Sequence, residues 1–183
     1  MDLEIKVCQG CSTCYHTGTC FIKDDSEKLV HMISESDGII IGSPTYASNV
    51  SGLLKVFIDR GHFVIEQALY GKYAMSVATS ENYGSKDTSQ VLNKLLTYSG
   101  AKLCSKIIQN LPFGSDFNSH SKLLKRLENE IEKFYDSVRH NRVYIWQSFV
   151  HKIIFSIGIK NFVLKKGNAY TGVIDKWKKF GII

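Results

Sequence analysis

Four cysteines lie close together near the start of the chain. Cys8, Cys11, Cys14 and Cys20 have the spacing C-x2-C-x2-C-x5-C, and a fifth, Cys104, stands apart. Three cysteines spaced three residues apart on a short loop can all direct their thiolates toward one metal centre, and the fourth cysteine can supply the last ligand. This pattern favours a [4Fe–4S] cluster; a zinc site and a redox-active thiol cluster are the alternatives. Cys104 falls in an apolar stretch, where we expect a small buried side chain.

The sequence shows neither a secretory leader nor a membrane span. Residues 1–20 are polar and broken by glycine, and the most apolar later stretch, 143–164, is interrupted by His151, Lys152 and Lys160. A bilayer crossing needs about 20 uninterrupted apolar residues. We therefore expect a cytoplasmic protein, in which thiols stay reduced and serve as metal ligands or catalysts rather than in disulfides.

The chain up to residue 140 alternates short apolar runs with amphipathic stretches. Continuously apolar runs predict strands buried on both faces, at 38–42, 73–79 and 101–108. A helical period of apolar residues predicts helices at 26–35, 51–63, 88–98 and 119–140. No hairpin signal separates these segments. Strand, loop and helix in alternation are typical of a parallel α/β sheet.

Polar loops follow the first two predicted strands, at 43–49 and 80–84. In an open parallel sheet, ligands bind beyond the carboxyl ends of the strands. A flat, partly polar ring would suit these loops, because backbone N–H groups can meet its carbonyls while Tyr46 or Tyr83 covers a face. Each loop taken alone is also typical of an ordinary surface loop.

The C-terminal part of the chain is aromatic and basic. The net charge of the whole chain is +6, and residues 121–183 carry 13 Lys and Arg against 5 Asp and Glu. We expect residues 1–140 to form a domain with a cysteine loop at 8–20, and residues 141–183 to form one or two helices packed over it or over a partner subunit. A membrane-surface helix is the alternative. Nucleic-acid binding is not expected, because no recognised motif accompanies the charge.

Taken in order, these features resemble the flavodoxin-like family of NAD(P)H-dependent FMN reductases, and more narrowly its iron–sulfur flavoprotein branch. The resemblance rests on the cysteine motif and on three further segments: Asp37-Gly38-Ile39-Ile40-Ile41-Gly42-Ser43-Pro44-Thr45-Tyr46, Ser51-Gly52-x-x-Lys55-x-Phe57-Ile58-Asp59-Arg60, and Gly71-Lys72. It implies a flavodoxin-like three-layer parallel sheet with a C-terminal helical extension, and FMN and a [4Fe–4S] cluster as cofactors. It also implies an NAD(P)H oxidoreductase or electron-transfer protein, a nicotinamide or protein electron donor, and a homo-oligomer such as a homodimer.

The resemblance also assigns residues to the two cofactors. The four clustered cysteines would hold the iron–sulfur centre. The flavin would lie along Ser43, Pro44, Thr45, Tyr46, Asn49, Ser80, Glu81, Asn82, Tyr83 and Gly84. Hydride transfer to a flavin needs no protein acid or base, so no catalytic residue is assigned. For Arg60, an ion pair with Asp59 or a neighbour and a functional role are both open.

The start of the chain departs from the family pattern. Members open with a strand and a phosphate-binding loop that meets the FMN phosphate at a helix N-terminus. Here Met1–Lys6 leads directly into the cysteines. We therefore expect a flavodoxin-like domain that is incomplete at its N-terminus. The alternative function is an iron–sulfur or metal-binding module that no longer binds FMN.

Overall fold

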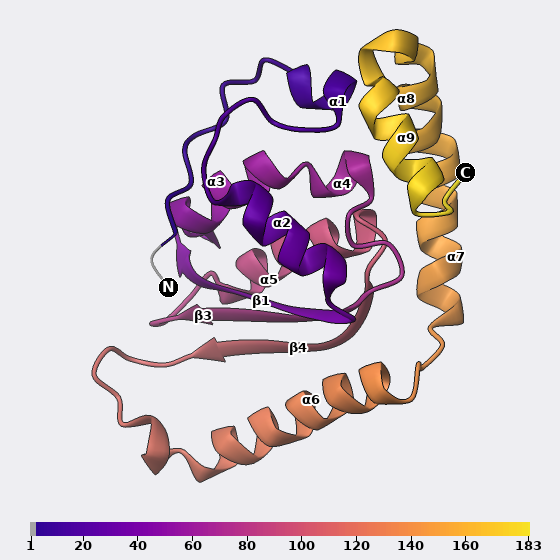
Figure 1. The fold of residues 1–183 in the computed structure, drawn as a ribbon. Helices are drawn as coiled ribbons and strands as arrows, with labels where there is room; N and C mark the ends of the chain where they lie inside the picture. Colours follow the sequence, from indigo (N-terminus) through magenta and orange to yellow (C-terminus); the bar gives the residue numbers. More distant parts are fainter. Residues whose placement is uncertain (1–2) are drawn as a thin grey trace.

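A computed structural model describes residues 3–183, with only the backbone at Phe117. In this part of the chain, four strands form one sheet in the order β2-β1-β3-β4. Strands β1 (Gly38–Tyr46), β3 (Tyr73–Ser80) and β4 (Lys102–Asn110) run parallel, and the short β2 (Asn49–Val50) runs antiparallel to β1. The predicted α/β fold with a parallel core is thus confirmed, with one antiparallel strand added at the edge (Figure 1).

The first predicted strand is longer than its apolar run. β1 continues through Ser43–Tyr46 and turns back into β2, so the prediction of a loop over residues 43–49 is wrong. Ala47 and Ser48, the two residues of the turn, have φ of 48° and 57°. This left-handed backbone matches the twist of a tight hairpin, which Asn-Gly usually marks in a sequence. Ala-Ser carries no such signal, and the hairpin was therefore missed.

Helices cover both faces of the sheet. Helix α6 (Ser121–Arg139) lies alone on one side, and the other side carries α2 (Ser26–Glu35), α3 (Gly52–Gly61), α4 (Phe63–Glu66) and α5 (Ser85–Tyr98) (Figure 1). The main core lies on this second side; its buried members are Ile41, Val50, Phe63, Leu69, Ala74, Leu92, Leu96 and Ala101. The helix predicted over 51–63 ends early, because His62 takes a left-handed φ of 47° and divides α3 from α4.

The C-terminal extension is helical and packs against the domain. After α6 come α7 (Ile145–Ile153), a π-helical turn η2 (Ile154–Ile159), α8 (Lys160–Lys166), η3 (Gly167–Tyr170) and α9 (Thr171–Lys179). Figure 1 shows α8 and α9 beside α1 (Thr13–Thr17), the helical turn within the cysteine loop. A second core joins these parts: Phe155, Val163, Val173 and Trp177, with Tyr15 of α1 and Ile65 of α4 packed against them.

None of the helices described for residues 3–183 has the length and apolar character that crossing a membrane requires. A short 3-10 turn, η1 (Phe117–Ser119), leads into α6.

Two parts of this fold can carry chemistry. They are the carboxyl ends of the parallel strands and the cysteine loop, which packs against the C-terminal helices.

Candidate functional site

A cavity of about 370 Å³ opens at the carboxyl ends of the three parallel strands. We call it the strand-end cavity. Its lining comes from β1, β3, β4, the segment after β4 and the start of α6, and consists of Pro44, Thr45, Tyr46, Val77, Thr79, Ser80, Glu81, Ile107, Gln109, Leu111, Phe113, Leu123 and Leu127. The volume is in the range of small-molecule sites, and the lining is mostly apolar with a few polar groups. Both properties suit a flat ring with polar edges.

Thr45 lies at the edge of this cavity, but its hydroxyl group is closed off from it. Its Oγ1 is buried and has no partner among the described residues. A buried hydroxyl without a partner costs about 1–3 kcal/mol, so proteins seldom leave one unpaired. The Thr45 side chain lies toward Gly84, which precedes α5, and away from the cavity. The other polar residues that line the cavity are Thr79, Ser80, Glu81 and Gln109. Together with the apolar lining, they fit a flavin ring in shape and in polarity.

The structure divides the ten residues that the sequence assigned to the flavin. Five of them line the strand-end cavity: Pro44, Thr45, Tyr46, Ser80 and Glu81. Ser43 and Asn49 do not line this cavity, and their side chains form hydrogen bonds within the hairpin. The Ser43 Oγ accepts from the Ser51 N–H at 2.8 Å and donates to the Pro44 carbonyl at 2.7 Å, and Asn49 Oδ1 accepts from the Val50 N–H at 2.8 Å.

The remaining three lie on the loop after β3 without lining the cavity. Gly84 directly precedes α5, has a φ of 86°, and lies against Thr45 and Ser48, so the two predicted loops do meet. The Asn82 carbonyl accepts a hydrogen bond from Asn110 Nδ2 at 2.6 Å, and the Tyr83 side chain is 74% exposed. Asn110 Oδ1 also accepts from the hydroxyls of Ser80 and Ser85, which fixes this loop to the end of β4.

Sequence reasoning missed the third wall of the cavity. Gln109, Leu111 and Phe113 come from the end of β4 and the segment that follows it, and Leu123 and Leu127 come from α6. The sequence signal for this wall is the polar pair Gln109-Asn110 at the end of β4, followed by Phe113-Gly114. As in the two loops that were predicted to bind the flavin, a strand ends there in polar residues.

A buried ion pair closes the base of the cysteine loop. The guanidinium of Arg60 in α3 donates to both carboxylate oxygens of Asp24, at 2.6 and 3.2 Å. It also donates to the carbonyls of Lys6 and Ile22, which flank the four cysteines on either side, at 2.8 and 3.3 Å. Asp24 in turn accepts from the N–H of Lys6 and of Ser26. The two ends of the loop are therefore held together on α3.

Asp24 titrates far from its ordinary range as a result. Burial by itself would raise the pKa of the carboxyl, but hydrogen bonds from Ser26, Lys6 and Arg60 outweigh burial and hold the pKa well below its usual value. Asp59, the partner that the sequence offered for Arg60, pairs with Lys55 instead. Arg60 thus anchors the loop and does not face the strand-end cavity.

Inside the loop, Cys14 is the buried thiol. Its Sγ lies 3.2 Å from Nε2 of His62, while Nδ1 of His62 lies 3.4 Å from Oε1 of Glu66. Glu66 Oε2 accepts from the ammonium of Lys176 in α9 at 2.8 Å. Burial would lower the pKa of His62, but its contacts with Cys14 and Glu66 outweigh burial and raise it to about 10. Lys176, Glu66 and His62 thus form a row of groups with alternating charge, which leads from α9 to the Cys14 thiol.

Helix α9 contacts the cysteine loop directly. Tyr15 stacks on Tyr170 with ring centroids 4.8 Å apart, and Thr171 Oγ1 donates to the His16 carbonyl at 2.9 Å. Gly172 lies so near the backbone of Gly18 that a Cβ at position 172 would collide with it. The C-terminal extension is therefore one wall of the cysteine site, which a search for local motifs does not reveal.

The four cysteines fit an iron–sulfur centre in donor type and in order along the loop. All are free thiols; Cys8 and Cys11 are exposed, Cys20 is half-buried and Cys14 is buried. Within residues 3–183, the structure brings no three potential ligands close enough to share one metal ion. The loop therefore presents four thiols on one short segment without an assembled coordination shell.

Comparisons with known proteins agree with this arrangement. The family model for NADPH-dependent FMN reductases matches residues 1–115. An iron–sulfur flavoprotein of Clostridioides difficile is 32% identical over 188 residues, which cover 100% of this chain and 81% of that protein. An iron–sulfur flavoprotein of Archaeoglobus fulgidus is 36% identical over 98 residues, 51% of this chain and 43% of the relative. The chain thus spans less than half the length of that archaeal protein.

Solved structures show the same fold. A Trp repressor binding protein from Bacillus subtilis superposes with a TM-score of 0.52 at 18% identity, covering 58% of this chain and 75% of that one. A flavone reductase superposes with a TM-score of 0.55 at 14% identity, covering 75% and 49%. The fold, the match to the family model and the full-length similarity to the clostridial protein lead to one conclusion: the chain belongs to the NADPH-dependent FMN reductase family.

Proposed function

We propose that this chain is a flavin-dependent oxidoreductase or electron-transfer protein that holds FMN in the strand-end cavity. The observation that carries the proposal is the strand-end cavity itself, a mostly apolar space of about 370 Å³ with a few polar residues at the carboxyl ends of the parallel strands. Membership of the FMN reductase family supports it. When bound, the flavin accepts a hydride and can release electrons singly.

The chain's own residues have binding and orienting roles in this proposal. Thr79 and Gln109 offer polar groups to an edge of the ring, and Tyr46, which is 61% exposed, offers a face to cover it. Leu111, Phe113, Leu123 and Leu127 exclude water from the apolar side. Ser80, whose hydroxyl donates to Asn110 Oδ1, and Glu81 also line the cavity.

We further propose that Cys8, Cys11, Cys14 and Cys20 hold an iron–sulfur centre of the [4Fe–4S] type. The support is the set of four free thiols on a loop whose two ends Arg60 ties together. The names of the clostridial and archaeal relatives point the same way. A nicotinamide is the electron donor that the family match suggests.

FMN titration of the full chain, followed by flavin fluorescence, tests the flavin proposal. We expect saturable binding of one FMN and, in the absence of oxygen, bleaching of the flavin absorbance on addition of NADPH. Absence of FMN binding would contradict the proposal, and binding without bleaching would restrict the chain to electron transfer from another donor.

Anaerobic reconstitution with iron and sulfide tests the second proposal independently. We expect about four irons and four sulfides per chain for a centre of this type, and their loss in a Cys11→Ser variant. The control is Cys104→Ser, because Cys104 lies on β4 away from the loop. Equal iron content in the two variants would contradict the assignment of the cysteine loop.

A further inference from the structure

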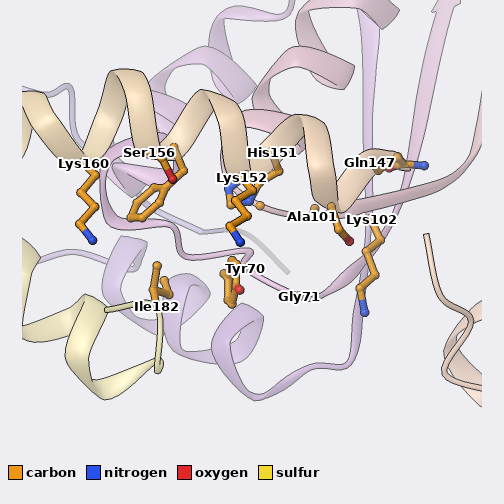
Figure 2. Close-up of a pocket in the computed structure, with 13 residues that line it drawn as sticks. Tyr70, Gly71, Ala101, Lys102, Gln147, His151, Lys152, Ser156, Lys160 and Ile182 are labelled. Carbon is orange, nitrogen blue, oxygen red and sulfur yellow. The ribbon is translucent and has the colours of Figure 1, made fainter. Parts of the chain in front are cut away.

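A second and larger cavity lies at the other end of the sheet. Its volume is about 650 Å³, and it is bordered by the turn at Tyr70–Gly71 before β3, by Gly100–Lys102 at the start of β4, by one face of the helix from Gln147 to Lys160, and by Ile182. Figure 2 shows this arrangement. We call it the amino-end cavity. Because the strands are parallel, their amino ends all lie at one end of the sheet, opposite to the end that carries the strand-end cavity. The proposed function makes no use of the amino-end cavity.

The charged residues around the amino-end cavity are all basic. Lys102, Lys152 and Lys160 line it, and its lining contains neither aspartate nor glutamate. No ion pair involves these three lysines anywhere in residues 3–183; the Lys102 ammonium lies over the Tyr73 ring, 4.6 Å from its centroid. In Figure 2, Lys152 and Lys160 extend from the same side of the helix toward Tyr70 and Ile182. A hollow lined by charge of one sign attracts ions of the opposite sign.

Hydroxyl groups alternate with the lysines along this helix. The cavity is lined in turn by Ser148, Lys152, Ser156 and Lys160. Every fourth residue of this helix therefore offers a hydrogen-bond donor to the same space. Lysine ammonium and serine hydroxyl together are groups that proteins use to bind phosphate. The helix also contains its π-helical turn here, at Ile154–Ile159, and such turns occur frequently at functional sites.

A buried side-chain pair holds this face of the helix in place. His151 lines the cavity, is 8% exposed, and its Nε2 donates to Oε1 of Gln67 at 2.6 Å. Gln67 is fully buried and has a left-handed φ of 55°, a conformation that costs a non-glycine residue free energy. Its Nε2 donates to the carbonyls of Val64 and Tyr98. A strained residue thus connects the helix, α4 and α5 beside the cavity.

We propose that the amino-end cavity binds a nucleoside phosphate. The phosphates would lie at Lys152, Lys160 and the two serines. The base would lie on the apolar side, where the Tyr70 ring is 46% exposed and Phe155 and Ile182 complete the wall. The volume accommodates a ligand of nucleotide size. This site shares no lining residue with the strand-end cavity, so the nucleotide proposal is tested independently of the flavin proposal.

Calorimetric titration of the full chain with ADP tests this site. We expect saturable ADP binding that is at least tenfold weaker in a Lys152→Met/Lys160→Met variant. The matched control is Lys165→Met/Lys166→Met, which removes the same charge from the same helical region but from residues that do not line the cavity. Adenosine and inorganic phosphate, titrated singly, should each bind more weakly than ADP.

Several outcomes would overturn the proposal. They are absence of ADP binding, equal weakening in both lysine pairs, and adenosine or phosphate binding as tightly as ADP. Displacement of ADP by FMN, together with unchanged ADP affinity in the Lys152→Met/Lys160→Met variant, would also overturn it, because ADP would then occupy the strand-end cavity. Far-UV circular dichroism checks that both double variants are folded. We expect the parent spectrum for both, because the four replaced lysines lie on the surface of the helices.

Discussion

Arg60 and Asp24 form a bidentate ion pair in which both side chains are withdrawn from solvent. Arg60 is 3% exposed and also binds the backbone on either side of the cysteine segment, through Lys6 and Ile22. One guanidinium therefore joins the two ends of the cysteine loop to α3. The geometry of that loop depends on this pair before any metal binds.

Replacing Arg60 with methionine should destabilise the protein by about 3–5 kcal/mol, because the variant leaves the Asp24 carboxylate buried without its partner. Arg60→Lys should recover only part of the loss, since an ammonium cannot form the two parallel hydrogen bonds. Urea unfolding measures both. Lys55→Met is the control: the Lys55–Asp59 pair is exposed, and its loss should cost less than about 1 kcal/mol. Similar losses for Arg60→Met and Lys55→Met would contradict the role of Arg60.

The same pair predicts how stability depends on pH. The pKa of Asp24 is lowered by folding, so its contribution is complete above about pH 4, the range of an unfolded aspartate, and is lost as the pH falls toward the folded value. Asp24→Asn should therefore be less stable than the parent at pH 7, with a gap that narrows below pH 4. Urea unfolding between pH 2.5 and 7 measures this gap. A constant gap across that range, with Asp59→Asn as the reference, would refute the prediction.

Thr45→Val removes a buried hydroxyl group at the end of β1. This hydroxyl has no partner in the described chain, so its removal should stabilise the FMN-free protein by about 1 kcal/mol. FMN affinity should be unchanged, because the Thr45 side chain lies toward Gly84 and its hydroxyl is closed off from the strand-end cavity. Fluorescence titration and thermal unfolding measure the two effects.

Thr88→Val is the matched control for that experiment. The Thr88 Oγ1 is likewise buried and unpartnered among the described residues, but it lies in α5 outside the strand-end cavity. The control should gain stability and keep its FMN affinity. A loss of FMN affinity in Thr45→Val alone would contradict the prediction and show that its hydroxyl reaches the ligand.

Gly172→Ala tests the contact between α9 and the cysteine loop. A Cβ at this position collides with the backbone of Gly18, so α1 must shift, at a cost of about 1–3 kcal/mol. Gly158→Ala, in open space on the same extension, should instead leave stability unchanged or raise it by a few tenths of a kcal/mol. Chemical denaturation gives the two energies, and hydrogen exchange of residues 13–20 should accelerate only in Gly172→Ala. Unchanged exchange there would show that α9 does not hold the loop.

Local patterns were enough to predict much of this fold. The apolar runs and helical periods predicted β3, β4, α2 and α6 to within a few residues, because each pattern is contained in a single element. The order of strands and helices predicted a parallel sheet, and with it the edge at which the strand-end cavity opens. Pro44, Thr45 and Tyr46 could be assigned to that edge for the same reason.

Other features depended on residues far apart in the chain. The carboxylate partner of Arg60 is 36 positions away, although Asp59 stands next to it and pairs with Lys55 instead. Glu66 pairs with Lys176, 110 positions away, in addition to the nearby His62. The β1–β2 hairpin formed at a turn without the usual residues, because pairing and burial of Val50 outweigh local preference.

The sequence by itself determined the family, the alternation of strands and helices, and the position of four thiols on one loop. Only the tertiary structure decided that Arg60 closes that loop, that α9 covers it, and that three separated segments share the strand-end cavity. The reason is physical: periodicity and motif spacing act along the chain, whereas the choice among several chemically equivalent partners is made by packing, which brings one of them into a buried position and leaves the others in water.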